Sequence, residues 1–150
     1  MRDTINAALK EATLARDKGR TGTLRLINAA IKDRDIEARG AGAGEATSSE
    51  LIDLLAKMVK QRLESARIYD ENGRPELAAQ ERAEIEIIQE YLPRQLNEDE
   101  AKAAIAAIIA ETGASGVRDM GKVMAELKTR HAGQMDFSKA SAAVKAALSG

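Results

Sequence analysis

The chain has 150 residues, which suffices for one hydrophobic core or for two small helical units in series. Its formal net charge of −1 excludes a global field that would draw it onto nucleic acid or an anionic membrane, and the absence of cysteine excludes disulfides and thiolate zinc sites. Only 2% of the residues are aromatic against 44% hydrophobic, so the core is expected to be aliphatic, which suits closely packed helices.

No apolar run reaches the ~18 residues of a membrane span, and none near the N-terminus resembles a signal peptide. We therefore expect a cytoplasmic location and no membrane partner.

Apolar residues at helical spacing predict two helices at the start of the chain. The first covers residues 4–18 and is ended by Gly19. The second begins near Thr21 and runs to residues 39–48, where three alternating glycines predict a flexible loop.

A long helical hairpin is predicted next. Thr47 and Glu50 lie three residues apart, which is the spacing of a capping box at the start of a third helix. Gly73 ends this helix, Pro75 opens a fourth, and Pro93 halts the fourth. The short turn makes the two helices antiparallel neighbours.

Three shorter helices are predicted in the rest of the chain. Asn97 can cap the fifth, which Gly113 ends, and the sixth starts near Asp119 and ends before Gly133. Asp136 can cap the last.

No segment alternates with a period of two, so the predicted fold class is all-α. We expect an N-terminal four-helix domain over residues 1–92, which contains the long hairpin, and a small C-terminal three-helix domain over residues 93–150.

Charged residues on the apolar stripes of the hairpin predict a buried ion pair. Arg62 falls on the stripe of the third helix and Glu81 on that of the fourth. Counting outward from the turn sets residue 62 opposite Glu84, so Arg62 is expected to pair with Glu81 or Glu84. Such a pair fixes helix register more than it adds stability. The fourth helix lacks Glu-x-x-His pairs, so we predict no metal site and no cofactor.

The last part of the chain is locally basic. Residues 118–145 contain six lysines and arginines against three acidic residues, around two glycine turns and two helix N-termini. Free backbone N–H groups beside Lys and Arg favour phosphate oxygens, although a solvated charged surface remains the alternative. The single histidine, His131, is interpreted as a residue at a helix end.

Four stretches resemble the GatB/YqeY-like proteins, and the stand-alone YqeY-type proteins in particular. They are the run Lys-Met-Val-Lys-Gln-Arg-Leu-Glu-Ser-Ala at residues 57–66, the runs at 73–78 and 91–96, and Asp-Met-Gly-Lys-Val-Met at 119–124. The resemblance implies an N-terminal helical domain followed by a three-helix domain like the tail of GatB, a subunit of the glutamine-dependent aminoacyl-tRNA amidotransferase. That tail contacts tRNA, and Gly121, Lys122, Met124 and Gly133 match its motif.

Charge and resemblance together define the candidate RNA-binding residues: Arg118, Gly121, Lys122, Lys128, Arg130, Gly133 and Lys139. We identify no catalytic residues, since no amidase nucleophile motif or nucleotide-binding loop is present.

Three functions follow. The first is an accessory tRNA-binding module related to tRNA-dependent amidation, without a catalytic domain of its own. The second is a protein–protein adaptor whose hairpin binds a protein of the translation or aminoacylation machinery. The third is the activity that the family label implies, a carbon–nitrogen ligase with glutamine as amido-N-donor.

Overall fold

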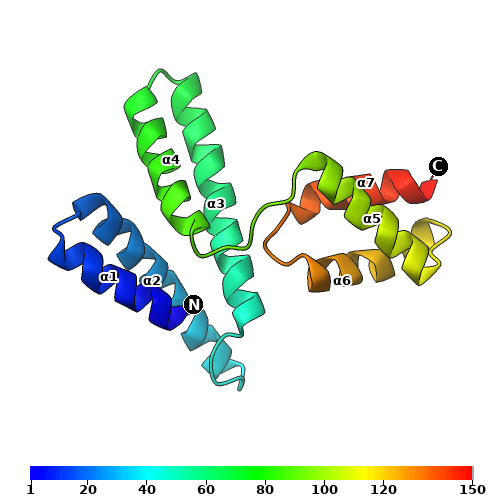
Figure 1. The fold of residues 1–150 in the computed structure, drawn as a ribbon, viewed down its shortest axis with the longest axis horizontal. Coiled ribbons are helices and arrows are strands. Elements are labelled where there is room, and N and C mark those ends of the chain that lie inside the picture. The colour runs from blue at the N-terminus through cyan, green and yellow to red at the C-terminus, as the bar shows by residue number, and fades with distance from the viewer. Residues whose placement is uncertain (150) are drawn as a thin grey trace. The chain divides into compact units, whose positions relative to one another are not determined.

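A computed structural model describes residues 1–149 as seven α-helices and one short 3₁₀-helix, and it has no strand among those residues (Figure 1). The predicted all-α fold class is confirmed. The helices form two compact units, the N-terminal unit over Met1–Leu92 and the C-terminal unit from Pro93 onward.

The N-terminal unit consists of four helices: α1 (Arg2–Leu14), α2 (Lys18–Gly40), α3 (Ser48–Glu71) and α4 (Pro75–Gln89). The helices α3 and α4 form an antiparallel hairpin, while α1 and α2 form a second pair (Figure 1). All four helices contribute apolar side chains to one core, whose fully buried members include Ile5, Leu24, Ile27, Leu55 and Ile88.

The break between α1 and α2 differs from the predicted one. α1 ends at Leu14, four residues early, and Gly19 lies inside α2 instead of ending α1. The reason is local: Arg16 takes a left-handed conformation with φ of 57°, and the carboxylate of Asp17 accepts a hydrogen bond from the Arg20 N–H at 3.1 Å. Asp17 therefore caps α2, and an aspartate N-cap outweighs the helix-ending tendency of the glycine.

The hairpin contains the ion pair that its apolar stripes suggested. Arg62 Nε donates to Glu84 Oε2 at 2.9 Å, and an Arg62 guanidinium nitrogen also donates to the Met58 carbonyl at 3.2 Å. The two charged side chains are 16% and 19% exposed, so they are partly buried and shielded from water on most sides. Of the two carboxylates considered, the structure pairs Arg62 with Glu84; Glu81 is half-buried and makes no ion pair with it.

A second polar cluster joins the start of α1 to α2. Arg2 donates to Asp35 at 2.6 Å and to the Ala46 carbonyl at 2.8 Å, and Asp35 accepts from the Ala46 N–H at 2.9 Å. The Arg2 hydrogen bond, followed by that from Ala46, lowers the pKa of Asp35. Sequence reasoning missed this cluster, although Asp35 follows Ile31 by four residues on the buried stripe of α2, and that spacing was a usable signal.

The C-terminal unit consists of α5 (Glu98–Thr112), the 3₁₀-helix η1 (Val117–Asp119), α6 (Met120–Arg130) and α7 (Phe137–Ser149). Its core is smaller than that of the N-terminal unit and includes Ile105, Ile108, Val123, Leu127 and Val144.

Caps define the helix starts of the C-terminal unit. The predicted Asn97 cap of α5 is confirmed as a complete capping box: the Asn97 side chain accepts from the Glu100 N–H at 2.8 Å, and the Glu100 carboxylate accepts from the Asn97 N–H at 3.0 Å. α6 begins at Met120, next to Asp119, where the sequence predicted its start, and the Asp119 side chain makes no cap hydrogen bond. It lies in η1 and accepts from the Ser115 N–H at 3.0 Å, which holds the turn before α6.

The turn between α6 and α7 is joined to the segment that precedes α5. Gly133 is buried in a left-handed conformation with φ of 72°, and its carbonyl accepts a hydrogen bond from the Gln95 side chain. The Leu96 N–H donates to the Gln134 carbonyl at 2.8 Å. A glycine is favoured at residue 133 because a side chain is strained at that φ.

Candidate functional site

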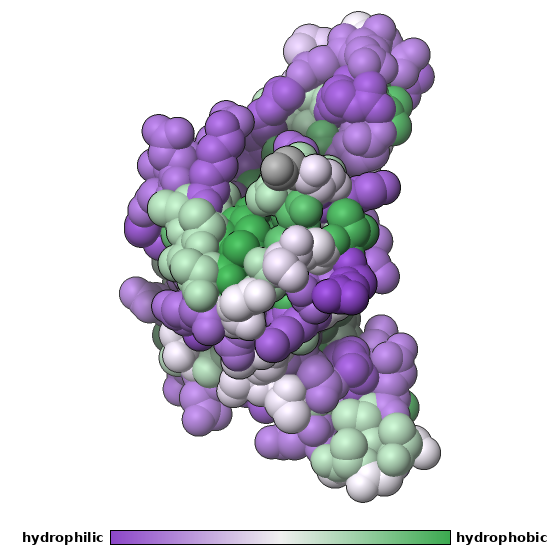
Figure 2. Space-filling model, turned by 90° about the vertical axis from the view of Figure 1, so that its right-hand side faces the viewer, coloured by the Kyte–Doolittle hydropathy of each residue, from purple (hydrophilic) through white to green (hydrophobic). Residues whose placement is uncertain are grey.

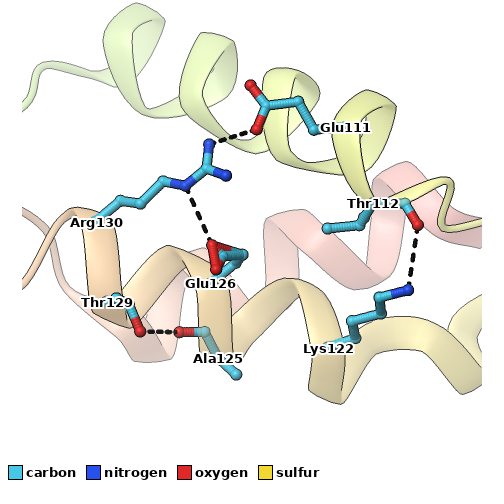
Figure 3. Close-up of a pocket in the computed structure, with 7 residues that line it drawn as sticks. All are labelled: Glu111, Thr112, Lys122, Ala125, Glu126, Thr129 and Arg130. Atoms are coloured by element: carbon cyan, nitrogen blue, oxygen red, sulfur yellow. Dashed lines mark hydrogen bonds and ion pairs between the residues drawn. The ribbon is translucent and has the colours of Figure 1, made fainter.

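A surface cleft of about 630 Å³ lies between α5 and α6 in the C-terminal unit (Figure 3). It contains two of the basic residues predicted to bind phosphate, Lys122 and Arg130. The cleft is lined by Glu111, Thr112, Lys122, Ala125, Glu126, Thr129 and Arg130.

Arg130 lies between two carboxylates. It contacts Glu111 of α5 at 2.6 Å and Glu126, one turn earlier in α6, at 3.1 Å (Figure 3). The hydrogen bond to Glu111 is the main reason why the pKa of Arg130 is raised, so its guanidinium stays charged at all ordinary pH values. Because two negative charges face one positive charge, this end of the cleft does not attract a further anion.

Lys122, at the other end of the cleft, is directed to the backbone of α5. Its ammonium group donates to the Thr112 carbonyl at 3.3 Å (Figure 3). Thr112 is the last residue of α5, where carbonyl groups lack partners within the helix. A cation at this position also interacts favourably with the helix dipole. Lys122 thus fastens the end of α5 to the first turn of α6.

The other predicted residues do not join this cleft. Arg118 lies in η1, Lys128 in α6 and Lys139 in α7, and all three are exposed. Gly121 is also exposed and has open space where a Cβ would lie. Within residues 1–149, none of those three cations is in an ion pair. The structure therefore brings only Lys122 and Arg130 together, and it uses both of them to hold helices.

The C-terminal unit also has an apolar surface. Figure 2 shows a patch of hydrophobic side chains on one face of this unit, surrounded by hydrophilic ones. Val117 of η1 is 45% exposed, and Ile109 of α5 and Leu148 of α7 pack against the core while remaining partly accessible.

Residues 1–149 have two further properties. No group of three or more His, Cys, Asp or Glu side chains there is arranged to hold a metal ion. None of the helices in that range combines the length and the apolar character needed to span a bilayer.

The sequence of the chain matches that of a known protein family. The model of the family described as Yqey-like protein matches residues 2–148, almost the whole chain. The chain belongs to the Yqey-like protein family. This confirms the resemblance found in the four sequence stretches.

Relatives of this Yqey-like chain share one name, "Altered inheritance of mitochondria protein 41, mitochondrial". The protein of that name from Eremothecium gossypii is 33% identical over 143 residues, which cover 93% of this chain and 76% of the relative. The one from Lachancea thermotolerans is 34% identical over 105 residues, or 69% of this chain and 54% of the relative. The one from Saccharomyces cerevisiae strain YJM789 is 32% identical over 88 residues, or 59% and 46%. For the last two, the match spans about half of the relative's length.

These relatives correct the predicted function. Their name concerns the inheritance of mitochondria, and the expected role as a tRNA-binding module of amidation, or as a carbon–nitrogen ligase, is wrong. The physical reason lies in the motif on which that prediction depended. Three of its four residues have structural roles in this fold: Gly133 holds a buried turn, Met124 packs against the core and Lys122 binds the Thr112 carbonyl at the end of α5.

The predicted cytoplasmic location is also contradicted, because these relatives are named as mitochondrial proteins. Composition and the lack of apolar runs report how a protein interacts with water, and an aqueous compartment inside an organelle imposes the same requirements as the cytoplasm.

Proposed function

We propose that this Yqey-like protein contributes to the inheritance of mitochondria, as the shared name states for its relatives, and that it acts by binding a protein partner. The observation that carries the proposal is the 33% identity over 93% of this chain with the Eremothecium gossypii protein. Both units lie within a match of that extent, so the proposal concerns the whole fold and not one motif.

Two features of the surface support binding as the mode of action. The first concerns the cleft between α5 and α6, where Glu111 and Glu126 neutralise the charge of Arg130. The polar groups of the cleft therefore serve to hold the helices. Large apolar side chains are nevertheless exposed on both units, and exposed apolar residues that share a face are a recognised feature of protein interfaces. They are Leu14, Leu26, Ile36, Leu63, Ile68 and Val117.

Complementation tests the proposal directly. A Saccharomyces cerevisiae strain that lacks its Altered inheritance of mitochondria protein 41 would express this chain behind a cleavable mitochondrial leader. We expect the chain to restore the fraction of daughter cells that inherit mitochondria toward the value given by the yeast protein.

The control is the core variant Leu24→Asp, which places a charge at a fully buried site and should not fold. If the wild-type chain accumulates in mitochondria and inheritance stays at the level of the Leu24→Asp strain, the proposal is wrong.

A further inference from the structure

The helix α2 has a second stripe, on the side opposite to its core. Its members are Leu26, Ala29, Asp33 and Ile36, and all four are exposed. Leu26 is 48% and Ile36 is 56% exposed, although both are large and aliphatic. The buried residues of the same helix, Leu24, Ile27 and Ile31 among them, face the core. We call the four exposed residues the outer stripe.

The spacing of the outer stripe is that of a coiled-coil interface. Its members follow one another at intervals of three, four and three residues, which correspond to successive a and d positions of a heptad. From Leu26 to Ile36 the stripe is about 15 Å long at the helical rise of 1.5 Å per residue. A stripe with this period presents one straight face to a partner helix.

Positive charges line one side of the outer stripe. Arg25, Lys32 and Arg39 recur at intervals of seven residues, each is exposed, and each occupies the position next to a heptad a position. Within residues 1–149 none of the three is in an ion pair, while Glu37 on the opposite side is already bound by Arg34 at 3.6 Å. We call these three cations the basic edge.

We propose that the outer stripe and the basic edge of α2 bind an amphipathic helix of a partner protein, whose own apolar stripe is accompanied by a row of carboxylates. The inference rests on the proposed function, for which it identifies the binding surface and the chemistry of the partner. Apolar contact with Leu26 and Ile36 supplies the attraction, and the basic edge selects acidic partners and sets orientation. Asp33, in the middle of the stripe, favours a partner with a hydrogen-bond donor at the facing position, which fixes register.

A second copy of this chain fits the surface poorly. In an antiparallel pair related by a two-fold axis, the basic edge of one copy would face the basic edge of the other. In a parallel pair the basic edge of one copy would face the other flank of the partner's outer stripe, which is formed by Thr23, Ala30 and Glu37. Of these, Thr23 is buried, Ala30 is apolar and Glu37 already has a partner. Carboxylates on a different protein therefore complement the three cations better than a second copy does.

Two synthetic peptides test the inference with the full-length chain. Both have about three heptads with leucine at a and alanine at d, except for an asparagine at the central position that faces Asp33; one carries glutamates at the flanking positions and the other carries lysines. Fluorescence anisotropy measures the dissociation constant of each. We expect the wild-type chain to bind the glutamate peptide about tenfold more tightly than the lysine peptide, with a preference that declines in high salt.

Three variants locate the binding. Arg25→Glu with Lys32→Glu should reverse the preference between the peptides, and Leu26→Asp with Ile36→Asp should abolish binding of both. Val117→Asp, at an apolar residue of the C-terminal unit with similar exposure, is the matched control and should bind like the wild type. Circular dichroism verifies that each variant is as helical as the wild type.

Several results would overturn the inference. They are the absence of binding to the glutamate peptide, equal binding of both peptides by the wild type, or wild-type binding by the Leu26→Asp, Ile36→Asp variant. A wild-type chain that sediments as a dimer, and becomes monomeric in that variant, would show that a second copy covers the stripe, and would overturn it as well.

The peptide measurement and yeast complementation test different statements, so one can fail while the other succeeds. If the wild-type chain does not restore inheritance, the proposed function is wrong, whereas the peptides still decide what the α2 surface binds. If the chain restores inheritance and the Leu26→Asp, Ile36→Asp variant restores it equally, the function stands and this surface is not the one through which it acts.

Discussion

The two units of the molecule hold their helices together by different means. In the N-terminal unit, arginine–carboxylate pairs join neighbouring helices, and they include Arg2–Asp35, Arg20–Glu90, Arg34–Glu50 and Arg62–Glu84. In the C-terminal unit one such pair, Arg130–Glu111, joins α6 to α5. Other side chains there bind backbone groups: Lys122 donates to the Thr112 carbonyl and Gln95 to that of Gly133. Charge pairs between helices are therefore more numerous in the larger unit, whereas the smaller unit depends more on contacts from side chains to the backbone.

The difference follows from the size of the two cores. The N-terminal core buries side chains from four helices, and partly buried arginines can lie along its edges. The C-terminal core is about half as large, with six buried residues against twelve. A small core also provides less stabilisation, so caps and turns contribute a larger share of the interactions that determine the fold.

Among the tests of this difference between the units, separating them should produce the largest change in stability. Expressed alone, residues 1–92 and residues 93–150 are each expected to be helical, because each unit has a core of its own. The shorter fragment should melt at the lower temperature, since small domains bury a smaller fraction of their surface. Thermal melts followed by circular dichroism measure both. An unfolded 1–92 fragment would show that the boundary at Pro93 does not separate two folding units.

The same substitution in each core provides the next test. Leu24 in the N-terminal unit and Leu127 in the C-terminal unit are both fully buried. Each Leu→Ala change should lower the free energy of unfolding of its own unit by about 2–5 kcal/mol. Urea unfolding followed by amide resonances distinguishes the units residue by residue. If Leu127→Ala shifted the N-terminal transition as much as the C-terminal one, the units would not be independent.

The Arg62 pair tests whether charge sets register in the larger unit. Arg62→Ala leaves the partly buried Glu84 without its partner, and we expect a loss of about 1–3 kcal/mol, between the values for exposed and for buried pairs. The control is Arg67→Ala, whose side chain is 56% exposed and pairs only within α3, with an expected loss of about 0.5 kcal/mol or less. Equal effects of the two changes on chemical denaturation would mean that Arg62 behaves as a surface residue.

Much of the fold could be predicted from the sequence because helix periodicity and caps are local signals. Thr47 and Asn97 cap α3 and α5 as their spacing indicated. Local rules failed where two of them competed, as at Gly19, whose tendency to end a helix was overridden by the Asp17 cap. The Arg2–Asp35 cluster joins residues 33 positions apart, and no pattern within one helix states which partner a buried aspartate has.

The site was less predictable than the fold, because the number of lysines and arginines in a segment does not reveal how they are used. From the sequence alone Arg130 is expected to be an unpaired cation, but in the structure it forms ion pairs with Glu111 and Glu126. Lys122 likewise binds the Thr112 carbonyl. The outer stripe of α2 was overlooked for a related reason: its spacing coexists with a stronger core stripe on the same helix, and only the exposure of Leu26 and Ile36 separates the two.

The smallest expected effect is the loss of stability at low pH through the capping box of α5. The hydrogen bond from Arg94, and then that from the Asn97 N–H, lower the pKa of Glu100 from 4.5 to about 2. A carboxylate with a lowered folded-state pKa stabilises the fold above its unfolded-state pKa, and this contribution disappears as the pH falls. The C-terminal unit should therefore lose stability between about pH 4.5 and pH 2, as the capping box opens.

The loss should be small because Arg94 is 70% exposed and water screens its pairing with Glu100. Glu100→Gln, which cannot ionise, should make the unfolding of the C-terminal unit less dependent on pH over that interval, while the N-terminal unit keeps its own dependence through Asp35. A carboxyl-carbon NMR titration measures the pKa directly. If Glu100 titrated near 4.5, its carboxylate would not be held by Arg94 and the N-terminus of α5.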